Sequence, residues 1–170
     1  MVQDPMKSTQ RKTKAAPAEM KMKNIIHLLS KFCAYQERTA GQVKERLKKY
    51  SLTADQGRRI MDQLVKEGFL NEERYARTYA LGKFRQNKWG HMKISYSLKA
   101  KGIHSDLIDQ AIQQIETEEY RALAKKLIAR KINEIKDKDP FLRNQKILRY
   151  MVMKGFETSL VQEILHSRDV

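Results

Sequence analysis

Residues 98–103 read LKAKGI, and the same pattern occurs as LKKYSL at 47–52 and as MVMKGF at 151–156. The last residues of the three stretches are 51 and then 53 positions apart. Apolar residues recur four and eight places after each stretch, and only Gln56 interrupts this series. A period near 50 residues with helical spacing indicates a repeat architecture. We therefore predict an all-α fold of tandem three-helix, helix-turn-helix-like repeats in an elongated, curved array.

Helical periodicity runs through most of the chain, whereas the alternation typical of strands is almost absent. The predicted repeats cover residues 19–70, 71–115 and 116–170, and a basic arm over 1–18 is expected to be disordered. We expect the first helix to bury an apolar stripe made of Ile25, Ile26, Leu28, Leu29 and Phe32.

Several residues mark where the predicted helices begin and end. Thr39, Thr53 and Asn71 are side chains of the kind that cap a helix N-terminus. Asp139 precedes a proline, which is tolerated at the first helical position because its missing N–H is not needed there. Gly68 follows an apolar helical pattern and is typical of a residue just past a helix C-terminus.

The composition points to a polyanionic partner. The 170 residues carry a net charge of +15, which favours binding to nucleic acid, to an acidic protein surface or to an assembly that presents both. Alternatively, the basic charge serves only to keep the protein soluble.

Cys33 is the only cysteine, so an internal disulfide is impossible and a reducing interior is the simplest context. No apolar run is long enough to span a membrane, and the N-terminus lacks the apolar core of a secretory signal.

The sequence gives no pattern typical of an active site. Its four histidines, His27, His91, His104 and His166, do not lie at metal-ligand spacing from one another or from cysteine and carboxylates. No glycine-rich phosphate loop is present. We therefore expect a protein that is not an enzyme and that holds no metal and no cofactor.

Positive charge is densest over residues 71–103, where eight basic residues stand against two acidic ones. The segment 84–93, FRQNKWGHMK, places aromatic rings among these bases, and such a mixture can stack on nucleotides or anchor a protein interface. We expect Phe84 to pack in the core, and leave Trp89 open between packing and contact. The candidate contact residues are Arg74, Arg77, Lys83, Arg85, Lys88, Trp89, Lys93, Lys99 and Lys101.

Residues 68–103, GFLNEERYARTYALGKFRQNKWGHMKISYSLKAKGI, resemble the core motif of the RecX regulatory-protein family. The motif has a glycine, an aromatic and an aliphatic residue before an acidic helix start. A turn that contains a glycine follows, and the motif closes on leucine, a base, glycine and an aliphatic residue. The departures are Trp89 before the joint glycine and His91 and Met92 after it, where proline and arginine are common in the family. The matching residues are Gly68 through Ala76, Gly90, Lys93, Ile94, Leu98, Lys101, Gly102 and Ile103.

The resemblance implies a fold of tandem three-helix repeats and a regulator without enzymatic activity. It implies binding to the RecA recombinase, chiefly as a filament on single-stranded DNA, and restraint of its ATPase, strand-exchange and coprotease activities. A protein of this kind would regulate DNA repair, recombination and the SOS response in the bacterial cytoplasm, and we expect it to be a monomer that makes no membrane contact.

Two other interpretations stay open. A direct DNA-binding protein would use the helices at 53–67 and 104–115 as helix-turn-helix units, and a helical adaptor would bind an acidic protein. The polar residues offered to DNA by those helices are Gln56, Arg58, Arg59, Gln63, Gln110, Gln113 and Gln114.

Overall fold

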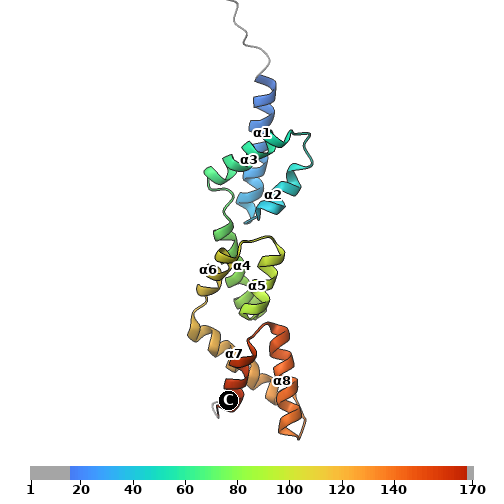
Figure 1. The fold of residues 1–170 in the computed structure, drawn as a ribbon, viewed down its shortest axis with the longest axis vertical. Helices are drawn as coiled ribbons and strands as arrows, with labels where there is room; N and C mark the ends of the chain where they lie inside the picture. The colour runs from blue at the N-terminus through green and yellow to red at the C-terminus, as the bar shows by residue number, and fades with distance from the viewer. Residues whose placement is uncertain (1–15, 168–170) are drawn as a thin grey trace, which may run out of the picture. The chain divides into compact units, whose positions relative to one another are not determined.

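The computed structural model describes residues 16–167, with side chains from residue 19 onward. All regular structure in this range is α-helical, which confirms the predicted fold class (Figure 1). The first fifteen residues of the predicted arm lie outside the described residues, and its last three belong to the first helix. The helices are α1 (Ala16–Tyr35), α2 (Ala40–Leu47), α3 (Ala54–Lys66), α4 (Glu72–Asn87), α5 (His91–Ala100), α6 (Ser105–Gln113), α7 (Thr117–Glu134), α8 (Pro140–Lys154) and α9 (Thr158–His166).

The described chain forms two compact units, one from residues 16–36 and 43–70 and the other from 37–42 and 71–167. In the first unit α1 buries Ile25, Leu29 and Cys33, which lie four residues apart on one face of the helix. The expectation for Leu28 is wrong, because that side chain is 51% exposed. Each residue turns the helix by about 100°, so Leu28 points away from the face that carries Leu29.

One hydrophobic core runs through the second unit and is shared by all of its helices from α4 to α9. Phe84, at 1% exposure, lies in this core, as expected from the sequence. Helices α4, α5 and α6 pack on one another, and α8 packs on both α7 and α9. The largest fully buried side chains of this core are Phe84, Ile94, Leu98, Ile128, Ile147, Met151, Phe156 and Ile164.

The hexapeptides at 98–103 and 151–156 occupy the same structural position, the C-terminal end of α5 and of α8. Their first residues, Leu98 and Met151, are both fully buried, and their last residues are nearly so. The glycine before the last residue has a positive φ in each, +79° at Gly102 and +90° at Gly155. The sequence register between these two stretches is therefore a structural register.

The predicted capping residues occupy N-terminal caps. Asn71 Oδ1 accepts a hydrogen bond from the backbone N–H of Arg74 at 2.8 Å, and Thr39 Oγ1 accepts one from that of Gln42 at 3.2 Å. Thr53 and Gln56 form a reciprocal capping box at the start of α3. Gln56 interrupts the apolar series of the repeats because its side chain closes this box.

Candidate functional site

A strip of alternating lysine ammonium groups and aromatic rings lies on the second unit. The Nζ atoms of Lys101 and Lys83 both lie 5.4 Å from the centre of the Tyr79 ring. Lys83 Nζ also lies 5.1 Å from the centre of the Trp89 ring, and Lys93 Nζ lies 4.9 Å from it. Each ring therefore has two cations within cation–π distance. We call these five residues the lysine–aromatic strip.

The strip is positioned by the turn between α4 and α5. Lys88 adopts the left-handed conformation with φ of 58°, and this reverses the chain at the end of α4. The backbone N–H of Trp89 then donates to the carbonyl oxygen of Lys83 at 3.2 Å, while the indole packs partly against the core. On the other ring, the Tyr79 hydroxyl lies 2.7 Å from Ser97 Oγ. The fold therefore holds both rings in place. The Trp89 side chain is partly buried against the core and partly exposed beside Lys83 and Lys93.

The same turn meets the last turn of α8 through two glycines. The N–H of Gly90 donates to the carbonyl oxygen of Lys154 at 2.8 Å, and the N–H of Met92 donates to that of Gly155 at 3.0 Å. A Cβ atom on Gly90 would lie 2.2 Å from the carbonyl oxygen of Gly155. The two backbones touch only because neither residue has a side chain. We call this contact the glycine joint.

A separate contact places His91 of α5 together with Tyr120 of α7 and Glu157, the residue that caps α9. The His91 and Tyr120 rings stack with centres 3.6 Å apart. The Tyr120 hydroxyl accepts a hydrogen bond from the backbone N–H of His91 at 3.1 Å and donates one to Glu157 Oε2 at 2.6 Å. His91 Nδ1 lies 3.3 Å from Glu157 Oε1. His91 is half-buried here, so its role in this structure is packing at the contact of α5 with α7 and α9.

The environment of this cluster shifts two pKa values in opposite directions. Burial, with the hydrogen bond to Glu157, raises the pKa of the Tyr120 hydroxyl, which keeps it protonated as a donor. Burial would also raise the pKa of Glu157, but hydrogen bonds from His91 and Tyr120 outweigh it and hold that pKa below its usual range. The cluster therefore pairs a neutral phenol with an ionised carboxylate.

The other predicted contact residues are not among the five residues of the lysine–aromatic strip. Arg74 pairs with Glu37, and Arg85 lies 3.4 Å from Glu119. Lys88 Nζ donates to the carbonyl oxygen of Arg85. Lys99 lies on the outer face of α5, and Arg77 lies at a groove beside α6. The nine candidates are thus spread over several surfaces, and only Lys83, Trp89, Lys93 and Lys101 lie together in the strip.

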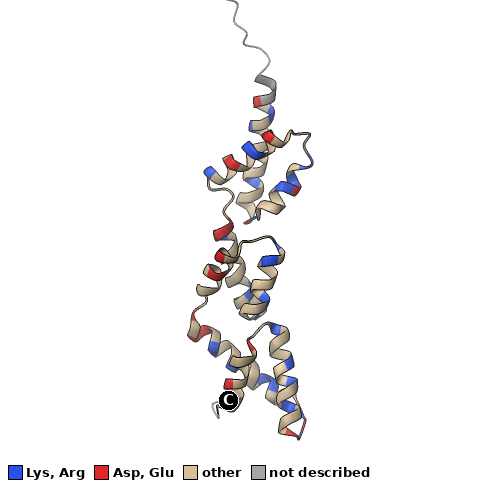
Figure 2. Ribbon diagram, viewed as in Figure 1, with Lys and Arg blue, Asp and Glu red and all other residues tan. Residues whose placement is uncertain are grey.

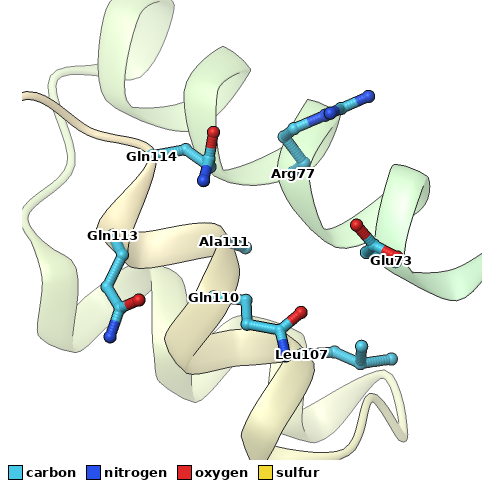
Figure 3. A pocket seen from close by; sticks show the side chains of 7 residues that line it. All are labelled: Glu73, Arg77, Leu107, Gln110, Ala111, Gln113 and Gln114. Atoms are coloured by element: carbon cyan, nitrogen blue, oxygen red, sulfur yellow. The ribbon is translucent and has the colours of Figure 1, made fainter.

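The groove beside Arg77 has a volume of about 150 Å³ and lies between α4 and α6. Figure 3 shows Glu73 and Arg77 on α4 facing the side chains of α6, with the guanidinium of Arg77 extending away from them. Glu73 lines the groove as well, and its negative charge disfavours a phosphate there. The remaining lining residues are Leu107, Gln110, Ala111, Gln113 and Gln114.

The polar residues of α3, offered to DNA in the helix-turn-helix interpretation, are engaged within their own helix. Arg58 and Arg59 pair with Asp55 at 3.4 and 2.9 Å. Gln63 Nε2 donates to Glu67 at 2.6 Å. No observation on α3 therefore favours it as a base-reading helix.

Charge is distributed unevenly over the helices of the second unit. Figure 2 shows basic but no acidic residues on α5 and α8, whereas acidic residues lie on α6 and at the starts of α4 and α7. Within residues 16–167, no group of three or more His, Cys, Asp or Glu side chains could hold a metal ion. Among the helices described, none combines the length and apolar character that crossing a membrane requires.

Comparison with known proteins identifies related domains over the second unit. Residues 71–112 match the family description "RecX, second three-helix domain", and residues 118–165 match "RecX, third three-helix domain". Together the two matches cover 90 of the 170 residues.

Similar full-length proteins carry the same family name. A protein of Clostridium perfringens named regulatory protein RecX is 28% identical over 130 residues, which are 75% of this chain and 60% of that protein. A protein of the same name from Streptococcus uberis is 28% identical over 134 residues, 78% of this chain and 51% of that protein. The chain thus spans between half and three fifths of the length of these curated relatives.

Two solved structures share the fold. The crystal structure of RecX from Lactobacillus salivarius superimposes with a TM-score of 0.81 at 19% identity, covering 89% of this chain and 98% of that one. A crystal structure of regulatory protein RecX gives a TM-score of 0.78 at 24% identity, covering 94% of this chain and 80% of that one.

Proposed function

This chain belongs to the RecX regulatory-protein family, and on that premise we propose that it binds the RecA recombinase filament on single-stranded DNA. Binding restrains the ATPase, strand-exchange and coprotease activities of the recombinase. In this proposal the protein acts without catalysis of its own, as a monomer in the bacterial cytoplasm, and regulates DNA repair, recombination and the SOS response.

The observation that carries the proposal is the lysine–aromatic strip. Ammonium groups neutralise phosphates, and aromatic rings stack on unpaired bases with little dependence on sequence. The core and the α4–α5 turn hold Tyr79 and Trp89, and the ammonium groups of Lys83, Lys93 and Lys101 lie within cation–π distance of these rings. A strip of this kind suits the single strand in a nucleoprotein filament better than a closed duplex, whose bases are already stacked.

The test removes charge from the strip and measures the DNA-dependent ATPase of the recombinase. In the variant, Lys83, Lys93 and Lys101 are each replaced by glutamine. In the matched control, Arg58, Arg59 and Lys66 are replaced by glutamine, because these three exposed residues lie on α3 and make the same change in net charge. The strip variant should need about tenfold more protein for half-inhibition, and the control should stay within about twofold of the parent chain.

Salt dependence gives a second readout. Each phosphate contact to a single strand contributes about 0.7 to the slope of log K against log salt, so loss of three contacts should reduce the slope by about 2. Unchanged inhibition by the strip variant at moderate salt would refute the assignment of the strip.

A gel shift separates the proposal from direct DNA binding. The parent chain is mixed with naked duplex, with naked single strand and with recombinase filament. Tight binding to duplex without recombinase would favour the helix-turn-helix interpretation, whereas preference for the filament supports the regulator.

A further inference from the structure

Exposed apolar side chains in the second unit are confined to two helices. Among its described residues, every exposed large apolar side chain lies on α5 or α8. The exposed fractions range from 48% at Leu142 and Val152 to 78% at Tyr96. We call these six residues the α5–α8 face: Met92, Tyr96, Phe141, Leu142, Val152 and Met153.

The same two helices contain no acidic residue and six basic ones. Lys99 and Arg149 are exposed beside the apolar residues. In the part of the chain that the structure describes, neither forms an ion pair with a carboxylate. The face therefore combines an apolar surface with uncompensated positive charge.

The glycine joint fixes α5 against α8 at one end of each helix. It bonds the first turn of α5 to the last turn of α8, as described above. In addition, Lys93 Nζ donates to the carbonyl oxygen of Met153 at 3.1 Å. Met92 and Met153 therefore flank the joint, while Ile94 and Met151 behind them are fully buried in the core. The exposed residues are thus presented by backbone that is fixed on its inner side.

We infer that the α5–α8 face is a docking surface for a protein with an apolar centre and an acidic rim. This inference rests on the proposed function, in which that protein is the recombinase protomer of the filament. Methionine, valine and leucine bury apolar area against a protein but offer nothing to phosphates and do not stack on bases. Apolar patches rimmed by charge are typical of protein interaction sites. Charge complementarity selects an acidic surface.

A second copy of this chain is a poorer occupant of the face. Two such faces would bring Lys99 and Arg149 of each chain together, with no acidic residue on these helices to pair with them. Like charges across an interface oppose association. The face and the lysine–aromatic strip then have different targets, protein for the face and DNA for the strip.

The experiment weakens each half of the face separately. One variant carries Met92→Ser and Tyr96→Ser on α5, and the other carries Val152→Ser and Met153→Ser on α8. The matched control carries Leu28→Ser and Val65→Ser, which are 51% and 57% exposed in the first unit. Binding of each variant is measured against recombinase filament on single-stranded DNA and against naked single-stranded DNA, and thermal melting checks the fold.

Either half-face variant should bind the filament about tenfold more weakly, with naked DNA binding and melting unchanged. The control should stay within about twofold of the parent chain. A third variant, Lys99→Glu with Arg149→Glu, reverses the charge complementarity. It should therefore weaken filament binding more at low salt than at high salt.

The opposing outcomes are distinct. If the parent chain does not bind the filament, both the proposed function and this inference fail. If the parent binds and inhibits but both half-face variants match the control, only this inference fails. Equal loss of naked DNA binding would assign the face to nucleic acid, and a parent dimer that the variants dissociate would assign it to a second copy; either result overturns the inference.

Discussion

Replacing Gly90 by alanine should break the glycine joint. The added Cβ would lie 2.2 Å from the carbonyl oxygen of Gly155, 2.3 Å from its carbonyl carbon and 2.5 Å from the nitrogen of Phe156. All three are backbone atoms, so no side-chain rotation relieves the overlap. The first turn of α5 and the last turn of α8 must move apart by more than 1 Å to reach ordinary contact distances of about 3.5–4 Å.

The magnitude follows from the hydrogen bonds that this movement breaks. The bonds from Gly90 to Lys154 and from Met92 to Gly155 are 2.8 and 3.0 Å long and do not survive such a separation. A buried donor or acceptor left without its partner costs about 1–3 kcal/mol, so two lost bonds give about 2–6 kcal/mol. That is a large share of the roughly 5–15 kcal/mol by which a folded domain is stable.

Urea unfolding measures the effect with two probes. Far-UV circular dichroism reports all helices, and the fluorescence of Trp89, the only tryptophan, reports the region of the joint. Gly82→Ala is the control, because a Cβ at this position in α4 meets no atom within 4 Å. Alanine is the better helix former, so the control should gain about 0.5–1 kcal/mol. A Gly90→Ala protein within about 0.5 kcal/mol of the parent would refute the reasoning.

Three further substitutions test the described contacts. Glu157→Gln should reduce the loss of unfolding free energy on acidification, because the folded pKa of Glu157 lies below its usual range. The stabilisation by Glu157 is complete above the unfolded pKa of about 4.3 and is lost as pH falls through the lower folded pKa. Urea unfolding from pH 7 to pH 3 measures this difference. Tyr120→Phe removes the partner of the His91 N–H and a donor to Glu157, and should lower the free energy of unfolding by about 1–3 kcal/mol; an unchanged urea midpoint would contradict this. Thr53→Ala opens the capping box of α3 and should cost about 1 kcal/mol in thermal or urea unfolding, whereas Thr53→Ser should change stability by only a few tenths of that.

Local features of the fold were predictable from the sequence. A cap acts within three residues of its helix, so Thr53 and Asn71 could be assigned from their neighbours alone, and both accept the expected hydrogen bonds. The repeat register was also predictable, because equivalent helices bury equivalent positions such as Leu98 and Met151.

The distribution of the basic residues was not predictable from their number. Residues 71–103 count as one positive segment in the sequence, yet Lys83 and Arg85 turn in different directions from α4 because each residue rotates the helix by about 100°. Lys83 joins Tyr79 and Trp89, whereas Arg85 pairs with Glu119. Which face a charge occupies depends on the packing of the helix, and that is set by residues far along the chain.

The contacts between α5 and the helices α7 to α9 were missed for the same reason. His91 meets Tyr120 and Glu157 across 29 and 66 positions of sequence, and neither partner has a local signature. The glycine at 90 was identified as a joint between two helices of one repeat. The hexapeptide register aligns Gly155 with Gly102, but nothing in the sequence predicts that Gly155 contacts Gly90.

The glycine joint limits how such a chain can be recombined from parts. Tandem repeats look interchangeable, yet the start of α5, in the middle of the second repeat, accepts only a neighbour with a bare backbone at the position of Gly155. A chimera that replaces residues 116–170 with a repeat from a relative should assemble only if the donor supplies a glycine there, whatever its overall identity. Modularity in this chain is therefore a property of matched neighbours and not of single repeats.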